Sequence, residues 1–252
     1  MISTLRSEWI KLVTVRMNAV LAIIAIAFPL VITVLTTVLI DPDDMTAGDL
    51  VGLVTGTSVV TGMLLGVIGA AGITGEFGFG TIRPTFAATP KRSRVIVAKA
   101  VITVVVGAVV EAVMVAVCFG VGSAVLGSRD GDISLSDADG GGSALVGIVC
   151  FAAIVSLLGF GLGMLIRSTP ASVAVLILWP LVGESLIGAL LTAAGVENAF
   201  KWLPYQAGFN LGNPDAGQAS DSLGRWTGGL YFLVVTLVVT GLGAWSTSRR
   251  DA

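Results

Sequence analysis

Six long runs of apolar residues, separated by short charged or polar breaks, make up most of this chain. They cover residues 17–40, 51–74, 95–126, 143–166, 171–194 and 227–245. The hydrocarbon core of a bilayer is about 30 Å thick, so a helix that rises about 1.5 Å per residue needs roughly 20 mostly apolar residues to cross it. All six runs satisfy this requirement. The pattern predicts an all-α polytopic membrane protein with six transmembrane helices in a single domain.

Lysine and arginine residues gather at alternate breaks between these runs. With six spans, the two termini share a side, and most of the 14 basic residues fall on it: Arg6, Lys11, Arg16, Arg83, Lys91, Arg92, Arg94, Lys99, Arg167, Arg249 and Arg250. The opposite side holds only Arg129, Lys201 and Arg225. Because short basic loops stay in the cytoplasm, both termini are predicted to be cytoplasmic. A bacterial inner membrane is the simplest host for so compact a six-span chain.

The composition agrees with a membrane protein and disfavours several kinds of enzyme. The chain is 55% hydrophobic and 12% charged, with a mean hydropathy of +0.96. It contains no histidine, which removes the commonest general base and the usual zinc ligand. It also lacks the glycine-rich loop that cradles nucleotide phosphates in many ATPases. We therefore expect no catalytic residue, no metal and no cofactor in this chain, and no nucleic-acid partner.

Residues 1–16 precede the first run and have an amphipathic pattern. A polar face with Ser7, Glu8 and Lys11 lies opposite an apolar stripe, which consists of Ile2, Leu5, Trp9, Leu12 and Val13. The pattern predicts an interfacial helix on the inner leaflet, with Trp9 at the depth of the lipid head groups. A disordered leader is the alternative.

Two connections between spans are more apolar than exposed loops need to be. On the cytoplasmic side, residues 75–94 combine basic side chains with Phe77, Phe79 and Phe86, which indicates a surface that docks a partner. On the external side, residues 195–226 are also rich in aromatic side chains. We predict that this external connection forms short helices that dip into the outer leaflet or cap a path through the spans.

Small residues and two prolines shape the predicted spans. Gly62 and Gly66 are four residues apart in the second span, and Gly159 and Gly163 have the same spacing in the fourth. Such spacing lets two helix backbones approach closely, either within this chain or against a second subunit. Pro29 lies inside the first span and Pro180 inside the fifth, and each predicts a kink.

Two carboxylates fall at membrane depth: Glu111 in the third span and Glu184 in the fifth. An ionisable residue at the centre of a bilayer costs about 3 kcal/mol, so each should face protein or a watery cavity instead of lipid. Both are candidates for lining a transport path or a subunit interface. The alternative is that each is a packing residue with no part in transport.

Several of these segments together resemble the membrane subunits of type-2 ATP-binding-cassette exporters. The resemblance rests on the run Ser7, Glu8, Trp9, Ile10 and Lys11, on Glu76 followed by Gly80, Thr81 and Arg83, and on Pro90, Lys91, Arg92, Lys99 and the run Leu203, Pro204 and Tyr205. In that family, the segment that begins at the glutamate forms a coupling helix, which docks on a separate ATPase subunit. The resemblance therefore implies that Glu76, Gly80, Thr81 and Arg83 lie at or near this contact. Pro84 restricts Arg83 away from helical geometry, so the coupling helix is expected to end there.

The resemblance also implies a function and its partners. This chain would be the permease subunit of an ATP-driven exporter and form the substrate path. ATP and Mg²⁺ would be bound by the partner ATPase, and a second six-span subunit, identical or related, would complete the transporter. Two alternatives stay open: an ion-coupled secondary transporter that uses Glu111 or Glu184, and a membrane anchor that recruits an ATPase without transporting anything.

Overall fold

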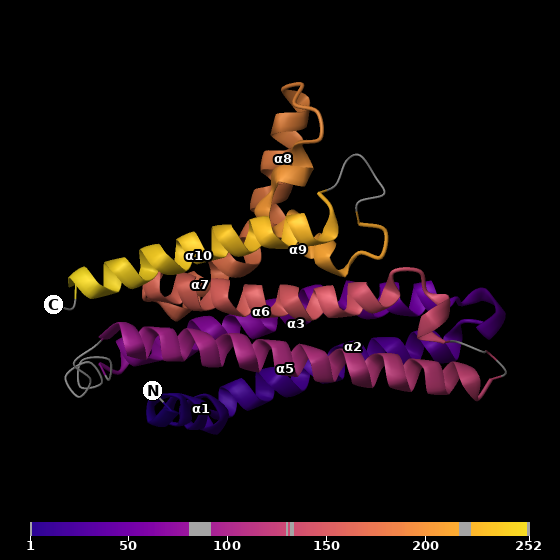
Figure 1. Ribbon diagram of the computed structural model, residues 1–252, viewed down its shortest axis with the longest axis horizontal. Coiled ribbons are helices and arrows are strands. Elements are labelled where there is room, and N and C mark those ends of the chain that lie inside the picture. The colour runs from indigo at the N-terminus through magenta and orange to yellow at the C-terminus, as the bar shows by residue number, and fades with distance from the viewer. Residues whose placement is uncertain (1, 81–91, 130, 132–133, 217–222, 251–252) are drawn as a thin grey trace.

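The structure, a computed structural model, describes residues 2–80, 92–129, 131, 134–216 and 223–250 (Figure 1). These residues form helices and connections, with no strand among them. The longer helices are α1 (Ile2–Thr14), α2 (Arg16–Leu39), α3 (Ala47–Gly78), α5 (Arg92–Gly127), α6 (Gly141–Ile166), α7 (Thr169–Leu178), α8 (Glu184–Ala193) and α10 (Arg225–Arg250). The short ones are η1 (Pro42–Asp44), η2 (Leu135–Asp137), η3 (Trp179–Gly183), η4 (Ala199–Trp202), α9 (Pro204–Phe209) and η5 (Asn210–Gly212).

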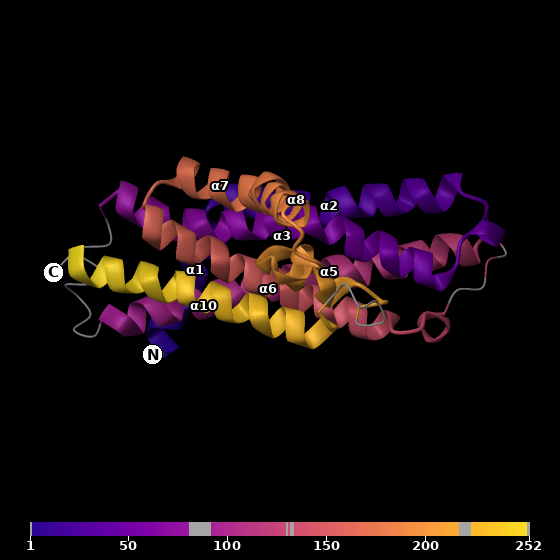
Figure 2. The same cartoon turned by 90° about the horizontal axis from the view of Figure 1, so that it is seen from above.

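Six helical segments of the described chain are long and apolar enough to cross a membrane. They are α2, α3, α5, α6, the continuous segment Thr169–Ala193, and α10. The predicted all-α class with six apolar helices is therefore confirmed. Apart from the second half of the fifth segment, these helices run side by side along the long axis of the molecule (Figures 1 and 2).

Helix α6 forms the centre of the bundle. It packs against α3, α5 and α10, while α2 lies against α3 and α5 (Figure 2). Residues all around α6 are buried, including Phe151 and Phe160. A helix that is apolar on every side must be enclosed in this way or face lipid.

Glycines set the spacing between α3 and α6. A Cβ atom placed on Gly159 would lie 2.0 Å from the carbonyl oxygen of Gly66, and one on Gly163 would lie 2.9 Å from the carbonyl oxygen of Ala70. On α3, a Cβ on Gly62 would lie 3.3 Å from the ring of Phe151. The close approach expected from the glycine spacing therefore occurs within this chain, between its second and fourth spans.

The fifth span is broken in direction by Pro180. The proline has no backbone N–H to donate, and the surrounding residues form the π-helical turn η3 between α7 and α8. Helix α7 runs along the bundle, whereas α8 projects away from it (Figures 1 and 2). The kink predicted at Pro180 is confirmed, whereas Pro29 lies inside α2, which continues as one helix from Arg16 to Leu39. The kink leaves Leu186 and Leu190 of α8 exposed.

The connection between the fifth and sixth spans, predicted to be external, packs on the bundle through aromatic rings. Tyr205 of α9 meets Phe151 of α6 edge to face, with ring centroids 5.2 Å apart, and also contacts Phe232 of α10. The hydroxyl of Tyr231 donates a hydrogen bond to the carbonyl oxygen of Trp202, at 3.0 Å. The described part of residues 195–226 thus forms short helices, as predicted. Its insertion into the outer leaflet stays a prediction.

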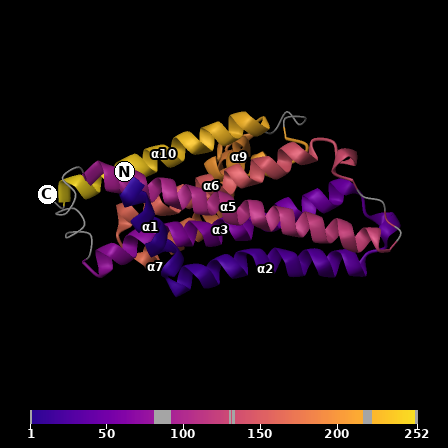
Figure 3. The ribbon, with the colours of Figure 1, turned by 60° about the horizontal axis from the view of Figure 1, so that its bottom comes forward.

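Both termini lie at the same end of the bundle (Figures 1 and 3). The ends of α3 and α5 that flank residues 81–91 are at this end too (Figure 1). The connections that contain η1 and η2 lie at the opposite end. This arrangement is expected, because a chain that crosses a membrane an even number of times begins and ends on the same side. That the end with the termini faces the cytoplasm stays a prediction from the charge pattern.

Candidate coupling site at the end of the bundle that holds the termini

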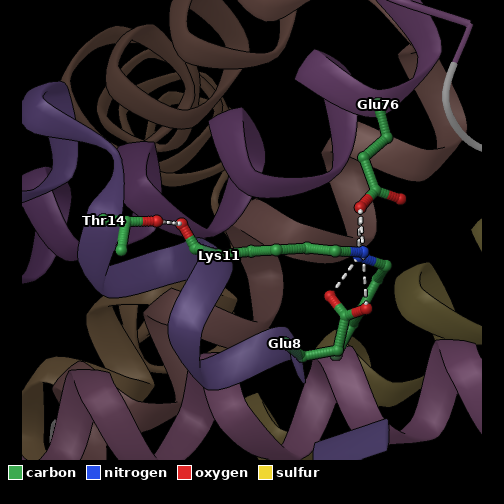
Figure 4. Close-up of polar contacts among 5 residues, drawn as sticks. Glu8, Lys11, Thr14 and Glu76 are labelled. Atoms are coloured by element: carbon green, nitrogen blue, oxygen red, sulfur yellow. Dashed lines mark hydrogen bonds and ion pairs between the residues drawn. The ribbon is translucent and has the colours of Figure 1, made fainter. Parts of the chain in front are cut away.

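Four charged side chains from three helices meet at the end of the bundle that holds the termini (Figure 4). Glu8 and Lys11 come from α1, Glu76 from the last turn of α3, and Lys99 from the second turn of α5. We refer to these four residues as the charge cluster. They bring together segments that are 91 residues apart along the chain.

Each ammonium group of the charge cluster contacts both carboxylates. Lys99 Nζ donates to Glu8 Oε2 and, at 2.6 Å, to Glu76 Oε1. Lys11 Nζ donates to Glu8 Oε1 at 2.9 Å and to Glu76 Oε1 at 3.3 Å. Two positive and two negative charges therefore balance. Such balance is needed because Glu8 is only 5% exposed and Lys99 only 7%.

The position of Glu76 in its helix makes it depend on these partners. A carboxylate in the last turn of an α-helix opposes the partial negative charge of the helix C-terminus. Glu76 occupies such a position in α3, so the ammonium groups of Lys11 and Lys99 offset an unfavourable local interaction. The cluster consequently fastens the end of α3 to α1 and α5.

Lys11 remains charged over the physiological pH range. Burial by itself lowers the pKa of Lys11, but hydrogen bonds and negative charge from Glu8 and Glu76 outweigh it, so the pKa is raised. A raised lysine pKa means that the pairing stabilises the fold fully below the ordinary value of 10.5. This contribution is lost only as the pH rises through the raised pKa, so no pH sensitivity near neutrality follows from Lys11.

A family model for ABC-2 family transporter proteins matches residues 8–252, which include all four residues of the charge cluster. The chain belongs to the ABC-2 transporter family. It is therefore the membrane component of a transporter, and the resemblance to type-2 ATP-binding-cassette membrane subunits is confirmed. No curated protein matches the chain.

The residues expected to form the coupling helix of this ABC-2 protein are only partly described. Glu76 lies inside α3, which runs without a break to Gly78, so the stretch expected to form the coupling helix begins as the last turn of the second span. The coupling role of this stretch stays a prediction. Helix α3 contains no proline. It ends shortly before Gly80, which adopts a left-handed conformation with φ 68°. Thr81, Arg83 and Pro84 lie outside the described residues, so the expected end of the coupling helix at Pro84 stays a prediction.

The two intramembrane carboxylates of the ABC-2 chain lie apart from the charge cluster and have different surroundings. Glu184, at the start of α8, is buried and accepts hydrogen bonds from the backbone N–H groups of Tyr205 and Gln206, at 2.8 and 3.1 Å. It thereby caps the first turn of α9 and holds the external connection to the fifth span. It also lines a cavity of about 230 Å³ beside α6 and α10.

Glu111 lies midway along α5 and is completely buried. Neither carboxyl oxygen has a hydrogen-bond partner among the described residues. Ser58 of α3 faces it, but the Ser58 hydroxyl donates to the carbonyl oxygen of Val54 at 3.0 Å. Glu111 thus faces protein and not lipid, as its cost in a bilayer requires.

The sequence predicts a coupling role for Glu76, but its ion-pair partners Lys11 and Lys99 were not predicted. Glu8 and Lys11 are predicted on the polar face of an interfacial helix, but Glu8 is buried against Lys99, whereas Trp9 and Val13 are exposed. The position of Lys99 could have indicated this pairing. Lys99 lies seven residues after the start of a membrane helix, where an ammonium group needs a carboxylate partner.

The Glu184 contacts allow a direct test of whether this residue does more than cap α9. Glu184→Gln keeps the shape of the side chain but leaves one of the two backbone N–H groups without an acceptor. We expect this to reduce the free energy of unfolding by about 1–3 kcal/mol, measured as thermal unfolding in detergent. Glu197→Gln, an exposed glutamate in the same connection, is the matched control and should change nothing. Full transport by the folded Glu184→Gln protein would assign Glu184 a capping role only, whereas loss of transport with unchanged stability would contradict this role.

Proposed function

We propose that this ABC-2 protein is the permease subunit of an ATP-driven exporter in a bacterial inner membrane. A separate ATP-binding-cassette subunit, which binds ATP and Mg²⁺, docks at the end of the bundle that holds the charge cluster. Both termini lie in the cytoplasm with it. Membership of the ABC-2 family and the position of the charge cluster support the proposal.

The observation that carries the proposal is the set of contacts at the last turn of α3. This turn directly precedes residues 81–91, and its Glu76 pairs with Lys11 of α1 and Lys99 of α5. The ring of Phe77 lies 4.7 Å below the guanidinium group of Arg167, at the end of α6. A displacement of the coupling segment would thus be passed to three helices at once. In this proposal Glu76, Gly80, Thr81 and Arg83 lie at or near the ATPase contact.

The transporter in this proposal contains a second six-span subunit, identical or related. Exposed leucines line α8, which projects from the bundle, and large apolar side chains such as Ile23 are exposed along α2. Part of this surface faces lipid. The projecting α8 offers an apolar surface that a second subunit would cover, and the substrate path would run between the two subunits.

Isolation of the complex tests this function. The chain, carrying an affinity tag, is purified from its own membranes in mild detergent, and its companions are identified by mass spectrometry. We expect an ATP-binding-cassette subunit, and ATP-dependent transport after reconstitution of both chains into vesicles. Transport driven by a proton gradient with no ATPase present would support the ion-coupled alternative. Recruitment of an ATPase without any transport would support the anchor alternative.

The predicted orientation can be checked with single cysteines. In a background with Cys118→Ala and Cys150→Ala, we expect a cysteine at position 3 to be protected from a membrane-impermeant maleimide in intact cells. A cysteine at position 128, at the opposite end of the bundle, should react. Both should react in opened membranes. The reverse pattern in intact cells would show that the termini face outward and would overturn the proposed ATPase contact.

A further inference from the structure

A cavity of about 740 Å³ lies beside the charge cluster, between α1, the start of α2, and the adjoining ends of α3 and α5. This volume is in the range of small-molecule binding sites. Glu8, Lys11, Glu76 and Lys99 form one wall, and Leu12, Ile102 and Phe160 contribute apolar surface elsewhere. One side of the cavity is therefore charged and the rest is largely apolar, as an amphipathic ligand requires.

Two residues that line this cavity each carry a buried hydrogen-bond acceptor with no partner among the described residues. The two acceptors are Asn18 Oδ1 and Glu76 Oε2. Asn18 is only 5% exposed, and its Nδ2 donates to the carbonyl oxygen of Leu12 at 2.9 Å. Because a carbonyl oxygen can only accept, this hydrogen bond fixes the amide orientation and leaves Oδ1 as the free acceptor. Buried acceptors are costly without a donor, so the ligand head group should supply N–H or O–H groups.

A positive side chain that is partly exposed also lines the cavity. The side chain of Lys11 is 49% exposed, and its ammonium group has both solvent and the charge cluster within reach. An anionic group beside the donor-bearing group of the ligand would therefore be favoured. A primary ammonium next to a phosphate, attached to apolar chains, meets all three requirements.

Two glycines leave room for such a ligand. Gly72 and Gly75 of α3 line the cavity, and a Cβ atom added to either would meet nothing within 4 Å. In the α3–α6 interface, glycines are needed for helix contact, but here their lack of a side chain keeps the cavity open. The wall formed by α3 can therefore be filled by substitution without a clash.

We propose that this cavity binds a phospholipid of the surrounding bilayer with a primary ammonium head group, of the phosphatidylethanolamine kind. The ammonium donates to Glu76 Oε2 and Asn18 Oδ1, the phosphate faces Lys11, and the acyl chains extend along the apolar wall. The lipid would complete the contact between α1 and α3 at the charge cluster. This inference does not depend on the presence of an ATPase partner.

Lipid retention by the purified chain tests the proposal. The protein is incubated with equimolar dioleoyl phosphatidylethanolamine and dioleoyl phosphatidylcholine in detergent, and bound lipid is counted by native mass spectrometry. The two lipids have the same chains and net charge, but the quaternary ammonium of phosphatidylcholine has no N–H donor. A hydrogen bond to a charged group gives about tenfold discrimination, so we expect about tenfold preference for phosphatidylethanolamine.

Matched glycine substitutions localise the binding. Gly72→Leu fills the cavity and should abolish the preference, whereas Gly56→Leu, on the same helix and also facing open space, should leave it unchanged. Both variants should be at least as stable as the wild type in thermal unfolding, because leucine is favoured over glycine inside a helix. Equal retention of the two lipids by the wild-type protein would overturn the proposal. So would an undiminished preference in a folded Gly72→Leu variant.

Discussion

Replacing Lys99 by methionine is expected to reduce the free energy of unfolding by about 3–5 kcal/mol, because it leaves the buried Glu8 and the partly buried Glu76 with one half-exposed partner, Lys11. The loss should appear as a large drop in the thermal unfolding temperature in detergent. Where the variant still assembles with an ATPase, stimulation of ATP hydrolysis should also fall, since Lys99 joins the end of α3 to α5.

A second substitution separates lost charge balance from lost packing. In Lys99→Met with Glu8→Gln, one charge of each sign is removed, and most of the stability should return because a buried ion pair is often no better than neutral side chains. Arg94→Met, an exposed substitution on the same helix, is the control and should have little effect. If the double variant is no more stable than Lys99→Met, the cluster is not held together by charge balance.

The helices could be predicted from the sequence because membrane spans are set by length and apolarity alone. The predicted run 143–166 and helix α6, for example, differ by only two residues at the start. Contacts within the chain could also be predicted where a single residue type determines them. Gly66 and Gly159 had to approach a backbone, although the sequence left open whether that backbone belonged to a second subunit.

Pairings between distant polar groups could not be predicted in this way. Lys99 and Glu8 are 91 residues apart, and Glu184 binds the backbone of a connection 21 residues away. The sequence alone left many possible hydrogen-bond partners for each side chain, because the partner depends on how the helices pack. The direction of α8 is a similar case: Pro180 indicates a kink but does not fix where the following helix points.

The charge cluster and the α3–α6 interface have different physical roles. The cluster is polar, lies at one end of the bundle and depends on exact charge balance, so a movement can rearrange it. The α3–α6 contact is made of backbone atoms that touch along several turns, with Gly69 as well as Gly159 against the facing helix. Such a contact has no alternative rotamers and should move as one unit. Displacement at Glu76 is therefore expected to move α3 and α6 together.

Gly159→Ala is the variant that tests this rigid contact. The added methyl group would lie 2.0 Å from the carbonyl oxygen of Gly66, and the only relief is a separation of α3 from α6. We expect the free energy of unfolding to fall by about 3 kcal/mol or more, at the upper end for an overpacked core, with a matching drop in the thermal unfolding temperature.

Gly56→Ala is the matched control. Gly56 also lies in α3, but a methyl group added there meets nothing within 4 Å. An alanine in a helix interior is favoured over glycine by about 1 kcal/mol, so this control should be neutral or slightly stabilising. Gly159→Ala is thus expected to be less stable than Gly56→Ala by about 3 kcal/mol or more, although the chemical change is the same. Equal thermal stability of the two would mean that α3 and α6 do not touch at Gly66 and Gly159, and the helix arrangement described for this chain would be incorrect at its centre.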